Sequence, residues 1–257
     1  MSKITENIHK VLHESWNISR TEKNKLLLND NNLKVEQVEK AGGGQNLGIF
    51  KILKSSKSYI VKLPKDTDFD NEPENVKFNN LKDFVKLNNS KLGFPHIVKY
   101  KNTFEVQDED KKSQMILLEK ACGESMDIFL QKSANDEQIL SDMKIIVKQM
   151  VNFWQCSGRL EFATDSNEWQ FLGNVHGDLT NFGNIFYSKN DKKVSFIDYS
   201  DLTTQTSIAN ELTQLLYGVE TALKESTLLQ EENIFKLMSY VSNEIKSGFI
   251  LNIREIN

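Results

Sequence analysis

The chain has very few cysteines and no long apolar run. Only Cys122 and Cys156 occur among 257 residues, and there is no CxxC pair or His/Cys cluster. A zinc site and a disulfide framework are therefore poor interpretations, and a reducing compartment fits better. No segment approaches the roughly 20 apolar residues of a membrane-spanning helix, so we expect no membrane span. The first 16 residues lack an unbroken apolar stretch, which argues against a cleaved signal peptide.

An excess of basic charge is also lacking. The net charge is −4, and lysine-rich patches such as residues 51–57 are surrounded by acidic residues. Because nucleic-acid binding generally requires a basic stripe, we expect no nucleic-acid partner. The hydrophobic fraction of 39% and the charged fraction of 26% are those of an ordinary globular protein with a sizeable core. We expect a cytoplasmic protein, or one exported by a route that uses no signal peptide.

The periodicity of apolar residues changes along the chain. Residues 3–16 have helical spacing and predict an amphipathic helix, either a docking element or a core helix. From residue 33 the pattern is typical of strands, with a helix over 72–87. The remaining sequence after Cys122 reads as mainly helical, apart from residues 174–187 and 194–200. We count five strands before the helical half, at 33–38, 46–53, 56–65, 91–106 and 113–121.

This order of elements predicts an α+β fold with two lobes. We expect an N-terminal helical extension over residues 1–32 and a small lobe of antiparallel strands with one helix over residues 33–120. A reduced, mainly helical lobe would follow over residues 121–257.

Two motifs in the predicted small lobe suggest phosphate binding. AGGGQNLGIFKI is a glycine-rich turn between strands, which lets backbone N–H groups approach a phosphate, although an ordinary hairpin turn explains it as well. Its glycines are Gly42, Gly43, Gly44 and Gly48. YIVKLPK places Lys62 inside an apolar strand, where it either meets an anionic partner or extends its amine to solvent. Glu74 is our first choice for a carboxylate partner and Glu72 our second.

A third motif supplies carboxylates and an amide. NVHGDLTNFGNIFY contains Asp178 on a tight turn and Asn184 six residues later, and VSFIDYSD ends a short strand at Asp198. Asp198 and Asn184 offer hard oxygen ligands that suit Mg²⁺, and Asp178 could accept a proton from an attacking hydroxyl. Each residue alone could simply cap a turn or end a strand. The three motifs in this order make that simpler explanation a poor one.

The segments HGDLTNFGNIF and VSFIDYSD resemble the catalytic and metal-binding segments of the protein-kinase-like superfamily. The HGDL form is most similar to aminoglycoside and choline phosphotransferases, whereas eukaryotic protein kinases usually have HRD. LLEKACGESMDIFL is similar to the hinge and the helix that follows it. The resemblance extends from about Leu33 to Gly218 and implies a two-lobed kinase-like fold that uses ATP with Mg²⁺, or Mn²⁺ as an alternative.

The resemblance also implies roles for single residues. The segment Gly42–Gly48 would cover the nucleotide phosphates, and Lys62 would bind the α- and β-phosphates and pair with Glu74. Backbone groups of Glu119 and Ala121 would contact adenine. Asp178 would be the catalytic base, and Asn184 and Asp198 would hold the metal ion.

The sequence departs from the family pattern in two places. The asparagine usually lies five residues after the aspartate, whereas Asn184 lies six residues after Asp178, so either the loop bulges or Asn181 takes the metal. We favour Asn184, because GNIF runs into apolar residues as the family motif does. Asp198 lies in DYS, where protein kinases have DFG.

Segment lengths bear on the substrate. Both the interval from Glu119 to Asp178 and that from Asp198 to Asn257 span 59 residues, too short for the usual substrate platforms of either enzyme group. The chain is thus similar to minimal serine/threonine kinases that bacteria inject into host cells. We expect a protein substrate, which in that setting would be a host protein, and leave room for an activating partner. The alternatives are a small-molecule phosphotransferase, a nucleotide-binding pseudokinase and an enzyme that transfers AMP.

Overall fold

The protein is a mixed α+β structure whose strands pair mainly antiparallel. The computed structural model describes residues 5–8, 10–12, 33–38, 46–54, 56–64, 82–108, 111–132, 136–156, 158–199, 202, 205–225 and 231–256. The chain forms two compact units, Met1–Asn79 with Lys99–Lys120 and Asn80–Val98 with Ala121–Asn257. The expected division after residue 120 coincides with a boundary between the units. Residues 80–98, which we had assigned to the small lobe, belong to the second unit.

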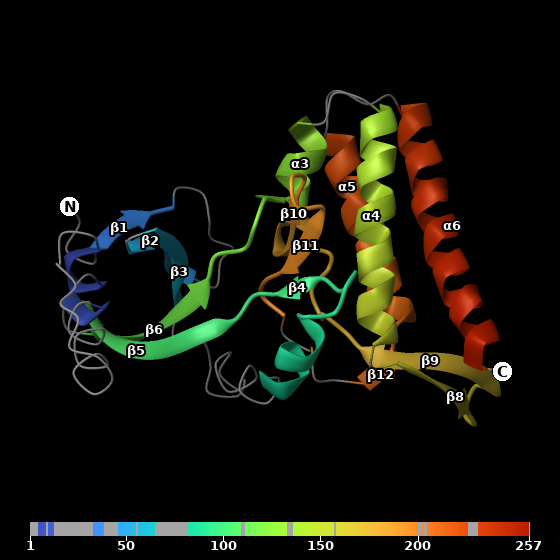
Figure 1. The fold of residues 1–257 in the computed structure, drawn as a ribbon, viewed down its shortest axis with the longest axis horizontal. Coiled ribbons are helices and arrows are strands. Elements are labelled where there is room, and N and C mark those ends of the chain that lie inside the picture. Colours follow the sequence, from blue (N-terminus) through green and yellow to red (C-terminus); the bar gives the residue numbers. More distant parts are fainter. Residues whose placement is uncertain are drawn as a thin grey trace. The chain divides into compact units, whose positions relative to one another are not determined.

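The first unit contains one antiparallel sheet with the strand order β1-β2-β3-β6-β5 (Figure 1). Its strands are β1 (Leu33–Gln37), β2 (Asn46–Lys54), β3 (Lys57–Pro64), β5 (Tyr100–Asp108) and β6 (Lys111–Glu119). The five predicted strands of this region are confirmed, with the fourth shortened at its start. Alternating apolar residues drive this arrangement because successive side chains of a strand point to opposite faces.

One face of this sheet packs against the N-terminal helix, which is described at residues 5–8 and 10–12. Ile8 and Leu12 of this helix are fully buried. The sheet contributes Val35, Phe50, Ile52, Val61, Leu63, Met115 and Leu117 to the same cluster. Of the two interpretations of this helix, the structure therefore supports the core helix.

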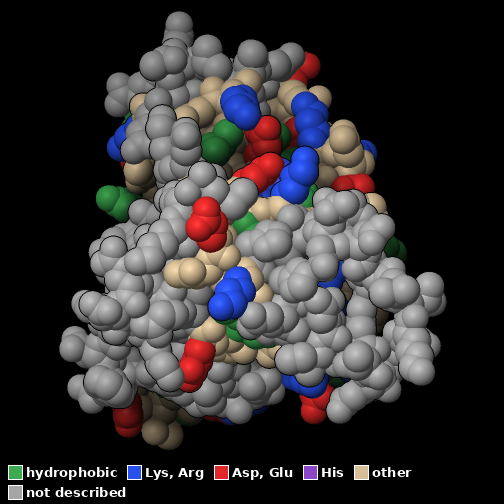
Figure 2. All heavy atoms as spheres, turned by 90° about the vertical axis from the view of Figure 1, so that its left-hand side faces the viewer, with side chains coloured by type: hydrophobic (Ala, Val, Ile, Leu, Met, Phe, Trp, Pro, Cys, Tyr) green, Lys and Arg blue, Asp and Glu red, His purple; other side chains and the backbone are tan. Residues whose placement is uncertain are grey.

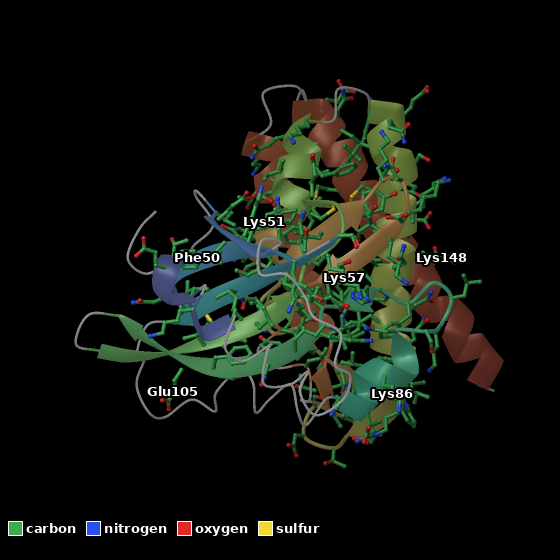
Figure 3. The ribbon with its side chains drawn as sticks, turned by 60° about the vertical axis from the view of Figure 1, so that its left-hand side comes forward. Phe50, Lys51, Lys57, Lys86, Glu105 and Lys148 are labelled. Carbon is green, nitrogen blue, oxygen red and sulfur yellow. The ribbon has the colours of Figure 1, made fainter. Side chains whose placement is uncertain are left out.

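The side chains of β2 show how the two faces differ. Phe50 is 1% exposed and belongs to the buried cluster, whereas its neighbour Lys51 points to the other face and pairs with Glu36 of β1 at 3.8 Å (Figure 3). Glu36 and Lys51 are cross-strand partners, so the ion pair follows from the register of the sheet.

The second unit is built around four helices of the C-terminal half. They are α3 (Met126–Lys132), α4 (Asp136–Gln155), α5 (Ala209–Glu225) and α6 (Glu231–Ile256), and a further helix covers residues 82–88. Both α4 and α5 pack against α6 (Figure 1). The buried residues of α4 recur at helical spacing and form one face: Ile139, Met143, Ile146, Val147, Met150, Phe153 and Trp154.

Two small sheets complete the second unit. The first has the order β4-β11-β10-β7, and the second has the order β12-β9-β8. Their strands are β4 (His96–Ile97), β7 (Glu124–Ser125), β8 (Arg159–Ala163), β9 (Glu168–Asn174), β10 (Ile185–Ser188), β11 (Lys193–Phe196) and β12 (Gln205–Ser207).

The prediction of a mainly helical second lobe was wrong for residues 159–173 and 205–207, which contain β8, most of β9, and β12. The alternation of β8 and the turn residues between β8 and β9 were signals for a hairpin.

The described surface carries charge of both signs. On the face shown in Figure 2, the coloured lysine and arginine side chains lie among aspartate and glutamate side chains. None of the helices in the described ranges combines the length and the apolar character needed to cross a bilayer.

Gly123 allows β7 to lie close to β10. Its φ of 86° is in the left-handed region, and a Cβ atom placed on it would lie 2.0 Å from the carbonyl oxygen of Tyr187. The pairing of Glu124 with Tyr187 and of Ser125 with Phe186 follows immediately. Any other residue at position 123 would both strain the backbone and push the two strands apart.

We expect Gly123→Ala to lower the free energy of unfolding by about 2 kcal/mol or more, because alanine would have to adopt a strained φ and displace β10. Chemical denaturation followed by circular dichroism measures this difference. The exposed neighbour Cys122 provides the control, since Cys122→Ala should change the stability by less than about 0.5 kcal/mol. Equal stability of the two variants would contradict this account of the turn.

Candidate functional site

The candidate site lies in the second unit, on the loop between β9 and β10. β12 pairs with β9 so that Gln205 lies opposite Asn174, and the segment after Asp198 therefore returns beside the strand that leads into the loop. A short 3-10 helix, η2 (Phe182–Asn184), closes the loop. Three buried apolar side chains hold the loop against the core: Leu179, Phe182 and Ile185.

The carboxylate of Asp178 accepts hydrogen bonds on both oxygens from residues of its own loop. The hydroxyl of Thr180 donates to Oδ1 at 3.1 Å, and Nδ2 of Asn184 donates to Oδ2 at 3.0 Å. The same Nδ2 donates to the backbone oxygen of Asp178 at 3.1 Å. Asn184 is only 3% exposed, and because its NH₂ group faces Asp178, its Oδ1 is left as the acceptor of that side chain.

Asn181 occupies a different position. Its side-chain oxygen caps η2 by accepting the N–H of Gly183 at 3.2 Å, and its backbone oxygen accepts the N–H of Asn184 at 2.9 Å. Of the two asparagines that the sequence left as alternatives, the structure brings Asn184 to Asp178 and leaves Asn181 exposed on the turn. Metal binding by Asn184 stays a prediction.

His176 connects the loop to the end of β11. The ring is fully buried, its Nε2 lies 2.8 Å from the backbone oxygen of Ile197, and its Nδ1 lies 3.3 Å from the backbone N–H of Asp178. These contacts fit the neutral tautomer in which Nε2 carries the proton and Nδ1 accepts. The ring also packs edge-to-face on Phe196 and Tyr199 at centroid distances of 5.2 and 6.4 Å.

Asp198 is held in an unusual backbone conformation. Its φ is 57°, a left-handed value that few residues other than glycine adopt. The residues on both sides of Asp198 are held by hydrogen bonds. The N–H of Ile197 donates to the backbone oxygen of Asn184 at 3.0 Å, and the hydroxyl of Tyr199 donates to the backbone oxygen of Val98 at 2.6 Å. Such locally strained conformations concentrate at functional sites, which favours a specific role for the Asp198 carboxylate.

The donor set suits a hard cation. Asn184 offers an amide oxygen and Asp198 a carboxylate, the ligand types that Mg²⁺ takes alongside water and substrate phosphates. Among the described residues, no group of three or more His, Cys, Asp or Glu side chains is placed to hold a metal ion. An ion held by one carboxylate, one amide and water does not require such a group, so the donor types of Asn184 and Asp198 are compatible with Mg²⁺.

Glu211, in the first turn of α5, is the residue that sequence reasoning missed. Its Oε1 accepts the backbone N–H of His176 at 2.5 Å and the indole N–H of Trp154 at 3.2 Å. Its Oε2 accepts the N–H of Gly177 at 3.1 Å. With 3% exposure, this carboxylate is buried and satisfied by three donors. Glu211 is therefore a positioning residue for the loop that carries Asp178.

The next turn of α5 supports the same loop. Oε1 of Gln214 lies 3.4 Å from the backbone N–H of Leu179, so α5 contacts the loop on both sides of Asp178. Nothing in the sequence distinguished Glu211, because an acidic residue in the first turn of a helix is common.

The β10–β11 hairpin beneath the site is attached to α4 by buried polar side chains. Gln149 accepts the N–H of Val194 at 3.0 Å and donates to the oxygen of Lys192 at 2.7 Å. The hydroxyl of Tyr187 donates to the buried carboxylate of Asp142 at 2.9 Å. Burial, followed by the hydrogen bond and the charge of Asp142, raises the pKa of Tyr187 well above its usual value, so this hydroxyl stays a donor.

The first unit contains Lys62, which is only 4% exposed. It lies between Ile49 of β2 and Ile116 of β6 as their cross-strand partner, on the sheet face opposite the buried cluster. A lysine that is both buried and flanked by isoleucines is consistent with a functional requirement for its charge. Lys62 is thus not a surface lysine that extends its amine into solvent.

The two residues predicted to contact adenine are placed as follows. The N–H of Glu119 donates to the oxygen of Lys99 at 2.9 Å, so this donor is already used within the first unit. Its carboxylate lies 3.5 Å from the amine of Lys101. Ala121 is buried in the second unit.

Several predicted residues fall outside the described part of the chain. These are Gly42, Gly43, Gly44, Glu72 and Glu74. Gly48 is described and lies within β2, next to an irregularity in the pairing with β3. A Cβ atom at Gly48 would lie 2.9 Å from the ring of Phe50.

Comparison with known proteins adds no assignment, because no family model and no curated protein matches the sequence.

We expect Glu211→Ala to lower the free energy of unfolding by roughly 3 kcal/mol, because it leaves the buried donors of His176, Gly177 and Trp154 without their acceptor. Hydrogen exchange at the amides of His176 and Gly177 should become faster in this variant. Glu220→Ala, which removes an exposed partner of Lys224 on the same helix, is the control and should leave both measurements almost unchanged. Unchanged protection of the two amides in Glu211→Ala would refute the positioning role.

Proposed function

We propose that the protein is an ATP- and Mg²⁺-dependent phosphotransferase with a protein-kinase-like two-lobed fold. In this proposal it transfers the γ-phosphate to a protein hydroxyl, as a minimal bacterial serine/threonine kinase of the effector type. The observation that carries the proposal is the arrangement of Asp178 and Asn184, whose side chains are joined at 3.0 Å. It places a candidate base beside a candidate metal ligand whose oxygen stays free for the ion.

Phosphoryl transfer requires positioning and charge neutralisation more than covalent help from the protein. Asp178 would accept the proton of the attacking hydroxyl, and its two loop donors keep the carboxylate in one orientation. Asn184 and Asp198 would hold Mg²⁺, which neutralises the phosphate charge when bound. Lys62 would bind the α- and β-phosphates, in line with its burial. Gly42–Gly48 and the chain at Glu119 and Ala121 would complete nucleotide binding, with Glu74 or Glu72 as the partner of Lys62.

The short interval of 59 residues from Glu119 to Asp178 favours a protein substrate, because it leaves no room for a pocket-building insertion, and the short connection after Asp198 favours constant activity. Only six residues separate Asp198 from Gln205, where β12 begins and pairs with β9. That interval leaves little room for a long segment that phosphorylation would have to order. The loop itself is held by Glu211 and Gln214 from α5. A phosphorylation switch is therefore not part of the proposal, although an activating partner fits it.

A small-molecule phosphotransferase is the second candidate, because Gly177 gives the HGDL form of the motif. Gly177 has a φ of 90°, so this position has a structural need for glycine that holds for either substrate class. A pseudokinase and an AMP transferase remain as further outcomes of the experiment below.

The central experiment incubates the purified protein with ATP labelled at either the α- or the γ-phosphate. A protein lysate and a small-metabolite extract are offered as acceptors in parallel. We expect label from γ-phosphate alone, in proteins, and a loss of at least 100-fold in Asp178→Ala and in Asp198→Ala, because base and metal ligand are both required. Chelation of divalent ions should abolish transfer as well. Label found only in small molecules would indicate the small-molecule phosphotransferase, and label from the α-phosphate would indicate AMP transfer. Undiminished transfer in both variants would contradict the proposed mechanism.

The two asparagines provide a matched pair. We expect Asn184→Ala to reduce phosphate transfer at least 100-fold and to raise the Mg²⁺ concentration needed for half-maximal activity, because it removes a metal ligand and a partner of Asp178. Asn181→Ala removes only the cap of η2 and should keep activity within about threefold. The opposite order of effects would show that Asn181 binds the metal.

A further inference from the structure

The β8–β9 hairpin carries an aromatic pair that faces solvent. Phe162 and Trp169 are cross-strand partners, and their rings meet edge-to-face at 5.5 Å. Phe162 is 45% exposed and Trp169 is 69% exposed. The next pair on the same face, Leu160 and Phe171, is only half-buried. The apolar face of the hairpin therefore becomes more exposed toward the turn, where it covers no described part of the core.

The same hairpin is acidic. Its strands and turn contain one arginine against three carboxylates: Arg159, Glu161, Asp165 and Glu168. Arg159 donates to Glu161. Asp165 in the turn and Glu168 beside Trp169 are exposed, and within the described ranges neither has an ion-pair partner. Exposed aromatic rings flanked by uncompensated carboxylates are suited to a cationic side chain, because ring faces and carboxylates both attract positive charge.

We infer that the tip of the β8–β9 hairpin is a docking site for a lysine- or arginine-rich segment of a protein. A cationic side chain would lie on the ring of Trp169, with Asp165 and Glu168 attracting its neighbours. Asp165 in the turn and Glu168, on the opposite face of β9, leave the tip of the hairpin negatively charged. This charge attracts a basic partner and gives a purely apolar one no advantage. The inference rests on the proposed function in one respect: the docked protein is taken to be the one that is phosphorylated.

The position of the hairpin suits this role. β9 runs from Glu168 to Asn174 and ends two residues before His176, so the docking strand continues directly into the loop that carries Asp178. In Figure 1 the hairpin lies at the C-terminal ends of α4 and α6, beside the connection to β12. A protein held at the hairpin would thus be bound by the same sheet that positions the loop.

The first arm of the test measures binding without catalysis. The full chain with Asp178→Asn is titrated against a fluorescein-labelled peptide of alternating arginine and glycine, and against a matched peptide in which glutamate replaces arginine. We expect binding of the arginine peptide alone, weakened at least tenfold by Trp169→Leu but less than threefold by Trp169→Phe, which keeps an aromatic face. The double variant Asp165→Asn/Glu168→Gln should weaken binding and reduce its salt dependence. Equal binding of both peptides, or unchanged binding in Trp169→Leu, overturns the inference.

Two controls separate recognition from folding. Phe235→Ala removes a side chain of similar exposure, 64%, near the start of α6 and should not affect binding. If Trp169→Leu is not folded by circular dichroism, the charge variant decides, since it changes no apolar side chain.

The second arm measures phosphate transfer with Asp178 intact. Myelin basic protein serves as a basic acceptor and casein as an acidic one. We expect Trp169→Leu to raise KM for the basic acceptor at least fivefold with kcat unchanged, and to leave acceptor-free ATP turnover as it is. An unchanged KM for the basic acceptor overturns the docking role. Absence of transfer to any acceptor contradicts the proposed function instead, and the binding arm then decides the docking site by itself.

Discussion

The buried carboxylate of Glu211 is the interaction on which the candidate site depends. A carboxylate without water requires hydrogen-bond donors, and the backbone N–H groups of a tight loop require acceptors. In this protein the two requirements satisfy each other, since Glu211 accepts from His176, Gly177 and Trp154. The loop conformation is thereby tied to the packing of α5 and α4. The position of Asp178 is a property of the second unit's core and not of the loop alone.

A second set of contacts links the loop to the segment that ends β11. His176 donates to the oxygen of Ile197, and the N–H of Ile197 donates to the oxygen of Asn184. Asp198 follows Ile197 directly and has a left-handed backbone. Asp178 and Asn184 therefore belong to one hydrogen-bonded assembly, and Asp198 directly follows the residue that joins this assembly to the end of β11. The six-residue step from Asp178 to Asn184 contains η2, which Asn181 caps.

Much of the first unit was predictable, because alternation along strands is a local property that burial of one face enforces. The alternation of Phe50 with Ile52 predicts β2, and that of Val61 with Leu63 predicts β3. The β8–β9 hairpin was predictable in principle from its alternation and its turn, but two of its aromatic residues, Phe162 and Trp169, are exposed, so burial of one face does not mark its strands. Glu211 was not predictable, since its partners lie 34 to 57 residues away in the chain.

The sequence by itself determined which chemical groups are available: one candidate base, an amide and a carboxylate with hard oxygens, and a lysine in an apolar strand. It also determined the local spacing that puts Asp178 and Asn184 on one loop. Only the tertiary structure decided which asparagine faces the aspartate, which helix holds the loop, and where an acidic, aromatic hairpin lies relative to it. The physical reason is that these outcomes depend on which distant donors and acceptors share one buried volume, and periodicity along the chain carries no information about that.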